Sequence, residues 1–316
     1  MVYIGIDVGG TTAKAGVVDE GGNILCKASC PTGIERPFED IAADMVELCR
    51  RVIRESGCGM EEFAAVGVGI PGQQNPQSGL VAFCNNLGWV DVPLMARLRD
   101  GLGLPVFVDN DANAAALAES AFGASRGVRS SILVTLGTGV GGGIVVDGRI
   151  LSGVRGAAGE IGHMVVVVDG EPCHCGHRGC WEKYSSATGL IRMGRELMEK
   201  KPDCALARQM GGDSGNLNAK AVLDLAKAGD ADCLEIFHTY VKYLCVGLSN
   251  LINVLDPDMF VLGGGVAYAG DFLLDAVRAS LRDYLYLPEL PTTQVELARL
   301  GNDAGIIGAA MLGRNR

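Results

Sequence analysis

The chain has 316 residues, of which 48% are hydrophobic and 20% charged, a balance that excludes a disordered protein and leaves enough apolar side chains for a large core. Its length predicts two domains. The formal net charge of −10 argues against nucleic acid as a partner, because no basic surplus is present to neutralise phosphates. A small anionic substrate is still compatible with that charge, since backbone N–H groups and a metal ion can hold phosphate.

The cysteine content and the N-terminal residues indicate a cytoplasmic protein. The eleven cysteines are an odd number in a long chain, and the opening MVYIGIDVGG begins directly as a strand. It has neither the charged nor the apolar region of a secretory signal, and no apolar run approaches the roughly 20 residues that cross a bilayer. We therefore expect a reducing compartment and no membrane partner.

Strands and helices alternate along the first part of the chain. Apolar stretches bounded by turn residues predict strands within 2–28, 64–72 and 104–110, and the first stretch forms hairpins at a Gly-Gly-Thr-Thr turn and at residues 19–22. Helices are predicted over 38–56, where Gly57 ends the apolar periodicity, around 93–99, and in an Ala-rich segment over 111–123. This succession indicates an α/β architecture.

Residues 131–151 repeat the plan of the opening. Each copy gives a strand, a turn of Gly and Thr and a second strand, followed by VVDGRIL here and by VVDEGGNIL in the opening. Two copies of one hairpin plan, each starting its own α/β region, indicate a duplicated architecture. The alternative is two ordinary hairpins that share common turn residues. Beyond them we predict mostly helix over 190–255, a strand and three glycines over 256–267, and a last helix over 304–312.

A cluster of metal-binding side chains lies between residues 159 and 186. Cys173, Cys175 and Cys180 have the spacing C-x-C-x4-C. The acids Glu160 and Glu182 bracket the cysteines, and the histidines nearby are His163, His174 and His177. A group of soft ligands this dense predicts a closed Cys3His zinc site, and the alternative is a set of reduced thiols without metal. The other eight cysteines have no such spacing and are interpreted as small core residues.

Glycine turns after apolar strands indicate a nucleotide site. The first turn, DVGGTTAK, places an acid at a strand end, glycines that permit close backbone approach, and donors for phosphate oxygens; it lacks the Walker A pattern. Its candidate residues are Asp7, Gly9, Gly10, Thr11, Thr12 and Lys14, with Asp7 placed to hold Mg2+ or its waters. Later turns add Gly137, Thr138, Gly139, Gly264 and Gly265. A single turn is as consistent with a plain hairpin, but three suggest a nucleotide clamped between two domains.

The motifs together resemble the ROK family of sugar kinases along almost the whole chain. They are D-x-G-G-T-x-x-K, V-x-N-D-A-N, L-G-T-G-x-G-G-G, E-x-G-H and C-x-C-G-x-x-G-C-x-E. The resemblance implies the actin-like, hexokinase-like fold, a duplicated ribonuclease H-like ATPase architecture whose two α/β domains close over ATP and a sugar. We expect a small domain over 1–112 plus 303–316 and a large domain over 113–302 that carries the zinc loop. Among ROK kinases the chain is most similar to bacterial glucokinases, with NNLGW (85–89) similar to their sugar-side loop.

The resemblance also implies roles for single residues. Asp111 matches the catalytic aspartate, the general base toward the sugar 6-hydroxyl, although Asp and Asn at a helix start are also good caps. Sugar-binding positions would be Gly72, Asn110, Asp111, Glu160, His163 and Glu182. The family pattern makes His163 the fourth zinc ligand, with its second ring nitrogen facing the sugar. The alternative for Glu160 and His163 is a solvated acid and a packed histidine. Zinc with four protein ligands would be structural.

Substrate choice is the open question at this stage. After Glu182 the chain reads YSSATGLI, where the family often has a Ser-Gly-x-Ala-Leu-type segment, and this departure lies beside the sugar. Kinases of N-acetylmannosamine and of fructose share the scaffold, and ROK transcriptional regulators bind sugar without phosphorylating it. Because this chain opens at the phosphate hairpin and keeps Asp7 and Asp111, we expect a glycolytic hexose kinase that uses ATP and Mg2+ to phosphorylate D-glucose to glucose 6-phosphate. Polyphosphate or ADP as donor is not distinguished from ATP. A homodimer or homotetramer is expected from the resemblance.

Overall fold

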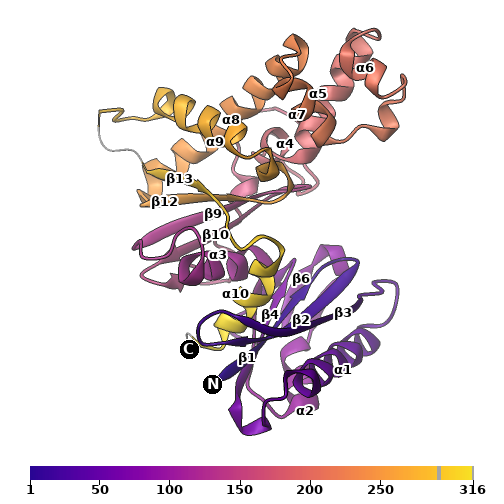
Figure 1. Cartoon of the computed structure of the whole chain (residues 1–316), viewed down its shortest axis with the longest axis vertical. Coiled ribbons are helices and arrows are strands. Elements are labelled where there is room, and N and C mark those ends of the chain that lie inside the picture. The colour runs from indigo at the N-terminus through magenta and orange to yellow at the C-terminus, as the bar shows by residue number, and fades with distance from the viewer. Residues whose placement is uncertain (290–292, 315–316) are drawn as a thin grey trace. The chain divides into compact units, whose positions relative to one another are not determined.

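The computed structural model describes residues 1–289 and 293–314, which form two compact units (Figure 1). The first unit holds residues 1–133, 143–159 and 299–316, and the second holds 134–142 and 160–298. Each unit is described by itself. The domain boundaries expected from the sequence lie at 112/113 and 302/303. They remain a prediction.

The first unit is built on a five-stranded sheet of order β3-β2-β1-β4-β8. Its strands are β1 (Val2–Val8), β2 (Thr12–Asp19), β3 (Ile24–Pro31), β4 (Phe63–Ile70) and β8 (Val106–Asn110). Strands β1, β2 and β3 pair antiparallel as successive hairpins, whereas β1, β4 and β8 pair in parallel. The predicted hairpins and strands are confirmed. The parallel strands end at one edge, and both Asp7 and Asn110 lie at strand ends there.

Helices cover both faces of this sheet (Figure 1). Alternate residues of a strand point to opposite faces, so Ile4 and Ile6 join the core under α1 (Phe38–Ser56) and α2 (Leu94–Leu102). Tyr3 and Ala65 face the other side, where α3 (Asp111–Phe122) and α10 (Ala304–Leu312) pack. The predicted bounds of α1 and α10 are confirmed. Gly57 ends α1 in the left-handed region, with φ 72°, as the sequence indicated.

A second five-stranded sheet has the order β11-β10-β9-β12-β13. Its strands are β9 (Ser130–Leu136), β10 (Val140–Val146), β11 (Arg149–Ile150), β12 (Met259–Gly263) and β13 (Gln294–Leu297). In both sheets the middle strand comes first in sequence: β1 in the first sheet and β9 in the second. The next two strands in sequence, β2 and β3 or β10 and β11, follow in order on one side of it. The recurrence of one strand order confirms the predicted duplication.

Helices of the second unit pack around the long helix α8 (Ala231–Leu255). Those in contact with it are α4 (Glu182–Ser185), α5 (Ala187–Lys200), α7 (Ala219–Lys227) and α9 (Asp271–Leu281), and α6 (Ala205–Gln209) packs against α5 and α7. The buried residues Phe237, Tyr240 and Leu244 follow helical spacing along α8, which explains why this helix lies in the core. The helical character predicted for 190–255 is confirmed.

Several elements were not predicted from the sequence. A three-stranded antiparallel sheet consists of β5 (Gln73–Gln74), β6 (Val81–Cys84) and β7 (Trp89–Val92), strands of two to four residues that are too short to show a period. Helix α9 and strand β13 were also missed. Single turns of 3-10 helix are η1 (Met60–Glu62), η2 (Asn85–Leu87), η3 (Ile161–His163), η4 (Ser214–Asn216), η5 (Gly265–Ala269), η6 (Arg282–Tyr284) and η7 (Gly301–Asp303).

All eleven cysteines are free thiols. Five of the eight cysteines outside the 173–180 cluster are buried, and the half-buried Cys26, Cys30 and Cys58 pack against the core of the first unit, in agreement with their interpretation as small apolar residues. In the described part of the chain, no helix combines the length and the apolar character needed to cross a membrane.

A buried carboxylate fastens the chain where it approaches α10. Glu119, on α3, is 1% exposed. Its Oε1 accepts hydrogen bonds from the backbone N–H groups of Arg299 (2.9 Å) and Leu300 (2.8 Å), and its Oε2 accepts one from Ala124 (2.7 Å). Water cannot replace a lost partner at such a site, so the carboxylate ties the end of α3 to the segment before α10.

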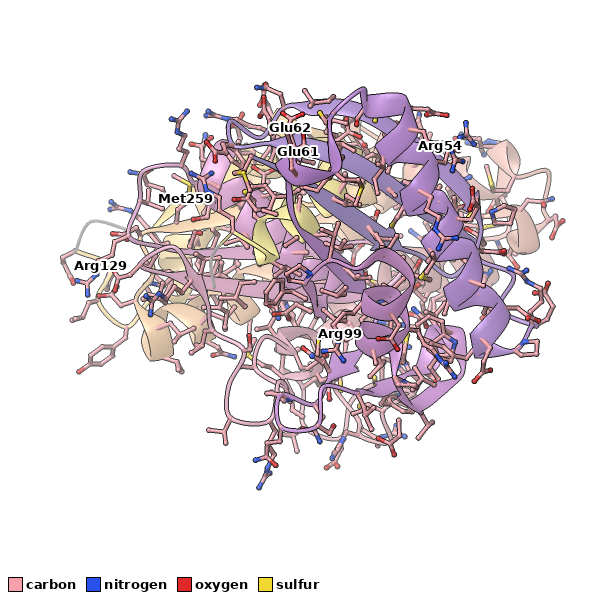
Figure 2. All side chains as sticks on the ribbon, turned by 90° about the horizontal axis from the view of Figure 1, so that it is seen from below. Arg54, Glu61, Glu62, Arg99, Arg129 and Met259 are labelled. Carbon is pink, nitrogen blue, oxygen red and sulfur yellow. The ribbon has the colours of Figure 1, made fainter. Side chains whose placement is uncertain are left out.

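Replacing Glu119 by alanine is expected to lower the free energy of unfolding by about 3 kcal/mol, because three backbone N–H groups lose their acceptor. Urea denaturation measures the change. Glu61→Ala is the matched control: Glu61 is exposed on η1 (Figure 2), and its loss should change stability by no more than about 0.5 kcal/mol. Equal effects of the two substitutions would contradict the role of Glu119.

Candidate active site

The first glycine turn joins β1 to β2 and brings all its predicted residues into one hairpin. The Gly9 N–H donates to the Thr12 carbonyl at 3.0 Å and closes the turn. Asp7 and Lys14 are direct partners in the β1–β2 register, and the Lys14 Nζ lies 3.9 Å from the Asp7 Oδ2. The hairpin therefore holds one acid and one cation at the base of a partly exposed turn.

Asp7 lies against the start of α10. A methyl group placed on Gly305 would come within 2.7 Å of the Asp7 carboxyl carbon, so only glycine lets the helix N-terminus approach this closely. Burial raises the pKa of Asp7, and this effect exceeds the lowering caused by Lys14. A carboxylate held in this way gains from a cation ligand, which is the property required of a residue that helps to hold Mg2+.

The predicted base lies at the N-terminus of α3. Asp111 is the first residue of the helix, and its own Oδ1 accepts from the Ala112 N–H at 2.8 Å. The helix cap, however, is Asn110, whose Oδ1 accepts from the N–H groups of Ala112 (2.8 Å) and Asn113 (3.3 Å). Capping alone therefore does not account for an acid at position 111. The positive end of the helix dipole favours the ionised carboxylate there.

Gly72 and Asn110 lie together beside this helix start. The Asn110 Nδ2 donates to the Gly72 carbonyl at 3.3 Å. A methyl group on Gly72 would lie 2.5 Å from the carbonyl oxygen of Phe83, so packing against β6 already requires glycine at this position. The sequence attributed this glycine to approach of a ligand. Asp109, which the sequence did not single out, accepts from the Asn110 N–H at 2.8 Å and from the Asn113 Nδ2 at 2.9 Å, and so orders the same loop.

In the second unit the three cysteines and His163 converge. Their potential ligand atoms all lie within 4.8 Å of one another. The sulfurs of Cys175 and Cys180 are 3.5 Å apart, and the Cys173 sulfur is 3.8 Å from the His163 Nδ1. Two sulfurs bound tetrahedrally at the usual Zn–S length would be about 3.8 Å apart, so the donor set and its spacing fit zinc.

The other two histidines reach only part of this group. The His177 Nδ1 lies 3.6 Å from the Cys175 sulfur, and the His174 Nδ1 lies 3.9 Å from the Cys173 sulfur. Among the described residues, His163 is the histidine that joins all three cysteines in one ligand-sized group. Its Nδ1 faces the thiols, which leaves its Nε2 for another partner, as the sequence interpretation required.

Two thiols of the cluster titrate in opposite directions. Burial raises the pKa of Cys173 far above the ordinary thiol value, and the hydrogen bond to Glu182 adds to this effect. For Cys175, burial acts in the same direction, but hydrogen bonds from His177 and from the two neighbouring thiols outweigh it and lower the pKa to about 6. One thiolate is therefore available near neutral pH for a metal ion to bind first.

Glu182 connects the cluster to the second glycine turn. Its Oε1 accepts from the Cys173 thiol at 3.1 Å and lies 3.4 Å from the His174 Nδ1. A methyl group on Gly139 would lie 2.5 Å from the Glu182 Oε2, so the glycine turn and the carboxylate are in direct contact. Glu160, in contrast, is exposed at the start of η3, and its carbonyl accepts from the His163 N–H at 3.1 Å.

The second and third glycine turns also meet. The Gly137 N–H donates to the Gly139 carbonyl at 3.0 Å, which closes the turn between β9 and β10. Gly264 has φ 82°, and a methyl group there would lie 2.7 Å from the backbone of Leu136. The turn after β12 is therefore pressed against the end of β9, which brings Gly264 close to Gly137 in the second unit.

Trp181 is a positioning residue that the sequence did not indicate. It lies between Cys180 of the thiol cluster and the acid Glu182 and is fully buried. Its indole N–H donates to the Tyr243 carbonyl of α8 at 2.8 Å, and the neighbouring Tyr240 hydroxyl donates to the Ser185 carbonyl at 2.9 Å. The local sequence signal was a large aromatic residue between two polar residues. Its hydrogen-bond partner on α8 lies 62 residues away in sequence and could not be identified from that signal.

Comparisons with known proteins agree with this geometry. A profile described as the ROK family matches residues 3–316. A glucokinase of Halalkalibacterium halodurans is 39% identical over 98% of this chain and 94% of its own length. The solved structure of a ROK family glucokinase from Streptomyces griseus in complex with glucose and AMPPNP matches with a TM-score of 0.84 at 37% identity, covering 100% of both chains. The predicted actin-like, hexokinase-like fold is confirmed. The xylose repressor of Bacillus subtilis is more distant, at 27% identity, and this chain covers 76% of it.

Replacing Asp7 by asparagine is expected to stabilise the protein at pH 7. The pKa of Asp7 is raised in the folded protein, so ionisation of this carboxyl group opposes folding. The wild type therefore loses stability as the pH rises from the ordinary carboxyl pKa through the raised folded value. The gain from asparagine should therefore shrink as the pH falls toward the ordinary carboxyl range. Urea denaturation of wild type and variant across this pH range, without added divalent cation, measures the difference.

Asp19→Asn is the control with the opposite sign. Hydrogen bonds from Asn23 hold the pKa of Asp19 below its usual value, so loss of this charge should not stabilise the protein at pH 7. A stability loss for Asp7→Asn at pH 7, or equal behaviour of the two variants, would contradict the assigned environment of Asp7.

Proposed function

Because this chain belongs to the ROK family, which matches residues 3–316, we propose that it transfers the γ-phosphoryl group of ATP to the 6-hydroxyl of D-glucose. The full-length match to a ROK glucokinase with bound glucose and AMPPNP carries the proposal. It is supported by the glycine turns, the acid at the start of α3 and the polar groups around Glu182, which are the kinds of group that such a reaction requires.

Asp111 is the proposed general base. A carboxylate at a helix N-terminus is a weak base, but phosphoryl transfer passes through a loose transition state in which positioning and charge neutralisation supply most of the rate. Because Asn110 caps the helix, the Asp111 carboxylate can be directed toward the sugar hydroxyl and accept its proton. Asn110 and Gly72, which contact one another, would bind neighbouring hydroxyls of the sugar.

The glycine turns are the proposed phosphate sites. Their residues are Asp7, Gly9, Gly10, Thr11, Thr12, Lys14, Gly137, Thr138, Gly139, Gly264 and Gly265. Backbone N–H groups and the Lys14 ammonium neutralise phosphate charge, and Asp7 would hold Mg2+ or its waters. When bound, Mg2+ neutralises charge that develops on the transferred phosphoryl group.

The remaining sugar contacts are assigned to Glu160, His163 and Glu182. A sugar presents several hydroxyl groups, and each one left unpaired on binding costs about 1–3 kcal/mol, so a set of carboxylate and imidazole partners is required. Cys173, Cys175, Cys180 and His163 would hold a structural zinc ion that fixes the loop between His163 and Glu182. With four protein ligands such an ion would have no open position, and its role would be to hold the sugar-binding groups in place.

Other properties follow from the same proposal. Free thiols throughout the chain support a reducing compartment, which we take to be the cytoplasm. Formation of glucose 6-phosphate would place the protein in carbohydrate metabolism, at the entry to glycolysis. A homodimer or homotetramer stays a prediction.

An assay that follows formation of the sugar phosphate tests the proposed function. Glucose, N-acetylmannosamine and fructose are supplied in turn with ATP, and polyphosphate and ADP replace ATP in parallel reactions. We expect the largest kcat/KM for glucose with ATP. Turnover with another hexose only would replace glucose as substrate, and the absence of turnover with every hexose, together with sugar binding by calorimetry, would favour a sugar-sensing protein.

Asp111→Asn is expected to retain glucose binding by calorimetry while kcat falls by at least about 100-fold, because the amide cannot accept the hydroxyl proton. Asp109→Asn, two residues earlier at the end of β8, is the control for a disturbed α3 start, and its effect on kcat should be much smaller. Near-normal turnover of Asp111→Asn would remove its assigned role.

Cys175→Ser is expected to lower the zinc content from about one ion per chain and to raise the KM for glucose, because a four-ligand site loses one thiolate. Elemental analysis and the sugar phosphate assay measure the two effects. Cys58→Ser, at a half-buried cysteine outside the cluster, should leave both unchanged. An unaltered metal content in Cys175→Ser would count against the site.

A further inference from the structure

We propose that Thr32, a residue outside every motif of the family resemblance, positions the first glycine turn for phosphate binding. This inference rests on the proposed function and adds to it a residue that hydrogen-bonds to the carbonyl groups of the turn. Thr32 follows β3 and is 1% exposed. A buried hydroxyl requires a hydrogen-bond partner, and the partner here belongs to the turn itself.

Thr32 makes two hydrogen bonds to the turn. Its Oγ1 donates to the Gly9 carbonyl at 2.7 Å, and its backbone N–H donates to the Thr11 carbonyl at 3.0 Å. The two accepting carbonyls lie on either side of Gly10. A single buried residue thus fixes the direction of two peptide groups of the turn.

The direction of those carbonyls fixes the direction of the N–H groups. In a planar trans peptide the C=O and the following N–H point in opposite directions. Because the carbonyls of Gly9 and Thr11 face Thr32, the N–H groups of Gly10 and Thr12 point away from it. Backbone N–H groups that face one way across a turn form a concave site for an anion, which for this protein would be a phosphate of the nucleotide.

Thr32 is itself held in place by helix α1. The Arg36 guanidinium donates to the Thr32 carbonyl at 3.2 Å and also to the Asp44 carboxylate at 2.6 Å. Asp44 lies within α1, so a chain of contacts leads from a helix packed on the sheet to the tip of the hairpin. The turn would otherwise be fastened at its tip by the Gly9 to Thr12 bond alone, which leaves its carbonyls free to rotate.

The second glycine turn has the same kind of support. The Ala187 N–H donates to the Gly137 carbonyl at 2.8 Å, and the Thr188 Oγ1 donates to the Thr138 carbonyl at 2.7 Å. A backbone N–H and a threonine hydroxyl again hold two carbonyls, and the N–H groups of Thr138 and Gly139 point away from them. Thr188 is exposed, so water competes for its hydroxyl, and its contribution should be smaller than that of Thr32.

Thr32→Val tests the inference, because valine keeps the shape of threonine and removes the hydroxyl. The affinity for AMPPNP, measured by calorimetry, is expected to fall about tenfold, the factor that corresponds to one hydrogen bond of ordinary strength, and the KM for ATP should rise in parallel. The Kd for glucose should stay within about twofold, since the sugar groups are not held by this turn. Thr32→Ser, which keeps the hydroxyl, should restore most of the AMPPNP affinity.

Thr239→Val is the matched control, on α8 and outside both turns, and should bind AMPPNP as the wild type does. Thr188→Val should weaken AMPPNP binding by about two- to threefold, and this result decides the matter if Thr32→Val does not fold. Unchanged AMPPNP affinity in Thr32→Val, or equal losses of AMPPNP and glucose binding, would overturn the proposal, because Thr32 would then serve the fold alone. If the wild type binds AMPPNP but phosphorylates no hexose, the proposed function fails while the test of Thr32 stands.

Discussion

The geometry of the planar peptide is the constraint on which the proposed nucleotide site depends. A β-hairpin turn can present either its carbonyls or its N–H groups to a ligand, and only the N–H groups attract phosphate. At the first turn Thr32 binds the carbonyls of Gly9 and Thr11 from the protein side, and at the second turn Ala187 and Thr188 do the same for Gly137 and Thr138. The duplicated sheets therefore supply two turns of the same polarity in the two compact units.

The proposed sugar-binding groups of the second unit are held in place by a different kind of constraint. They lie in a segment with little regular structure, so they need fixed points, and the thiol–imidazole cluster and the buried Trp181 are two of these. Trp181 is anchored on α8, and Glu182 follows it directly, in contact with both Cys173 and Gly139. The thiol–imidazole cluster, Glu182 and the second glycine turn thus form one connected group within the second unit.

Much of the fold could be predicted from the sequence, and the failures have identifiable causes. Helix α1 and its end at Gly57 were predicted because apolar spacing and a left-handed glycine are local signals. Strands β5, β6 and β7 are too short to show a period. The cysteine spacing predicted the metal cluster, and the resemblance selected His163 among three histidines, a choice that the ligand geometry favours. The hydrogen bonds of Thr32 and Trp181 and the contact of Gly305 with Asp7 join segments far apart in sequence, so a local pattern could not identify these partners.

Transfer of the γ-phosphoryl group of ATP to the sugar 6-hydroxyl is the central claim, and phosphorus NMR of the reaction products tests it most directly. With glucose and ATP, we predict resonances of ADP and of glucose 6-phosphate. With 6-deoxyglucose, which lacks the accepting hydroxyl, we predict binding by calorimetry and no sugar phosphate. A sugar phosphate formed from 6-deoxyglucose, or a product of glucose phosphorylated at another position, would contradict the account.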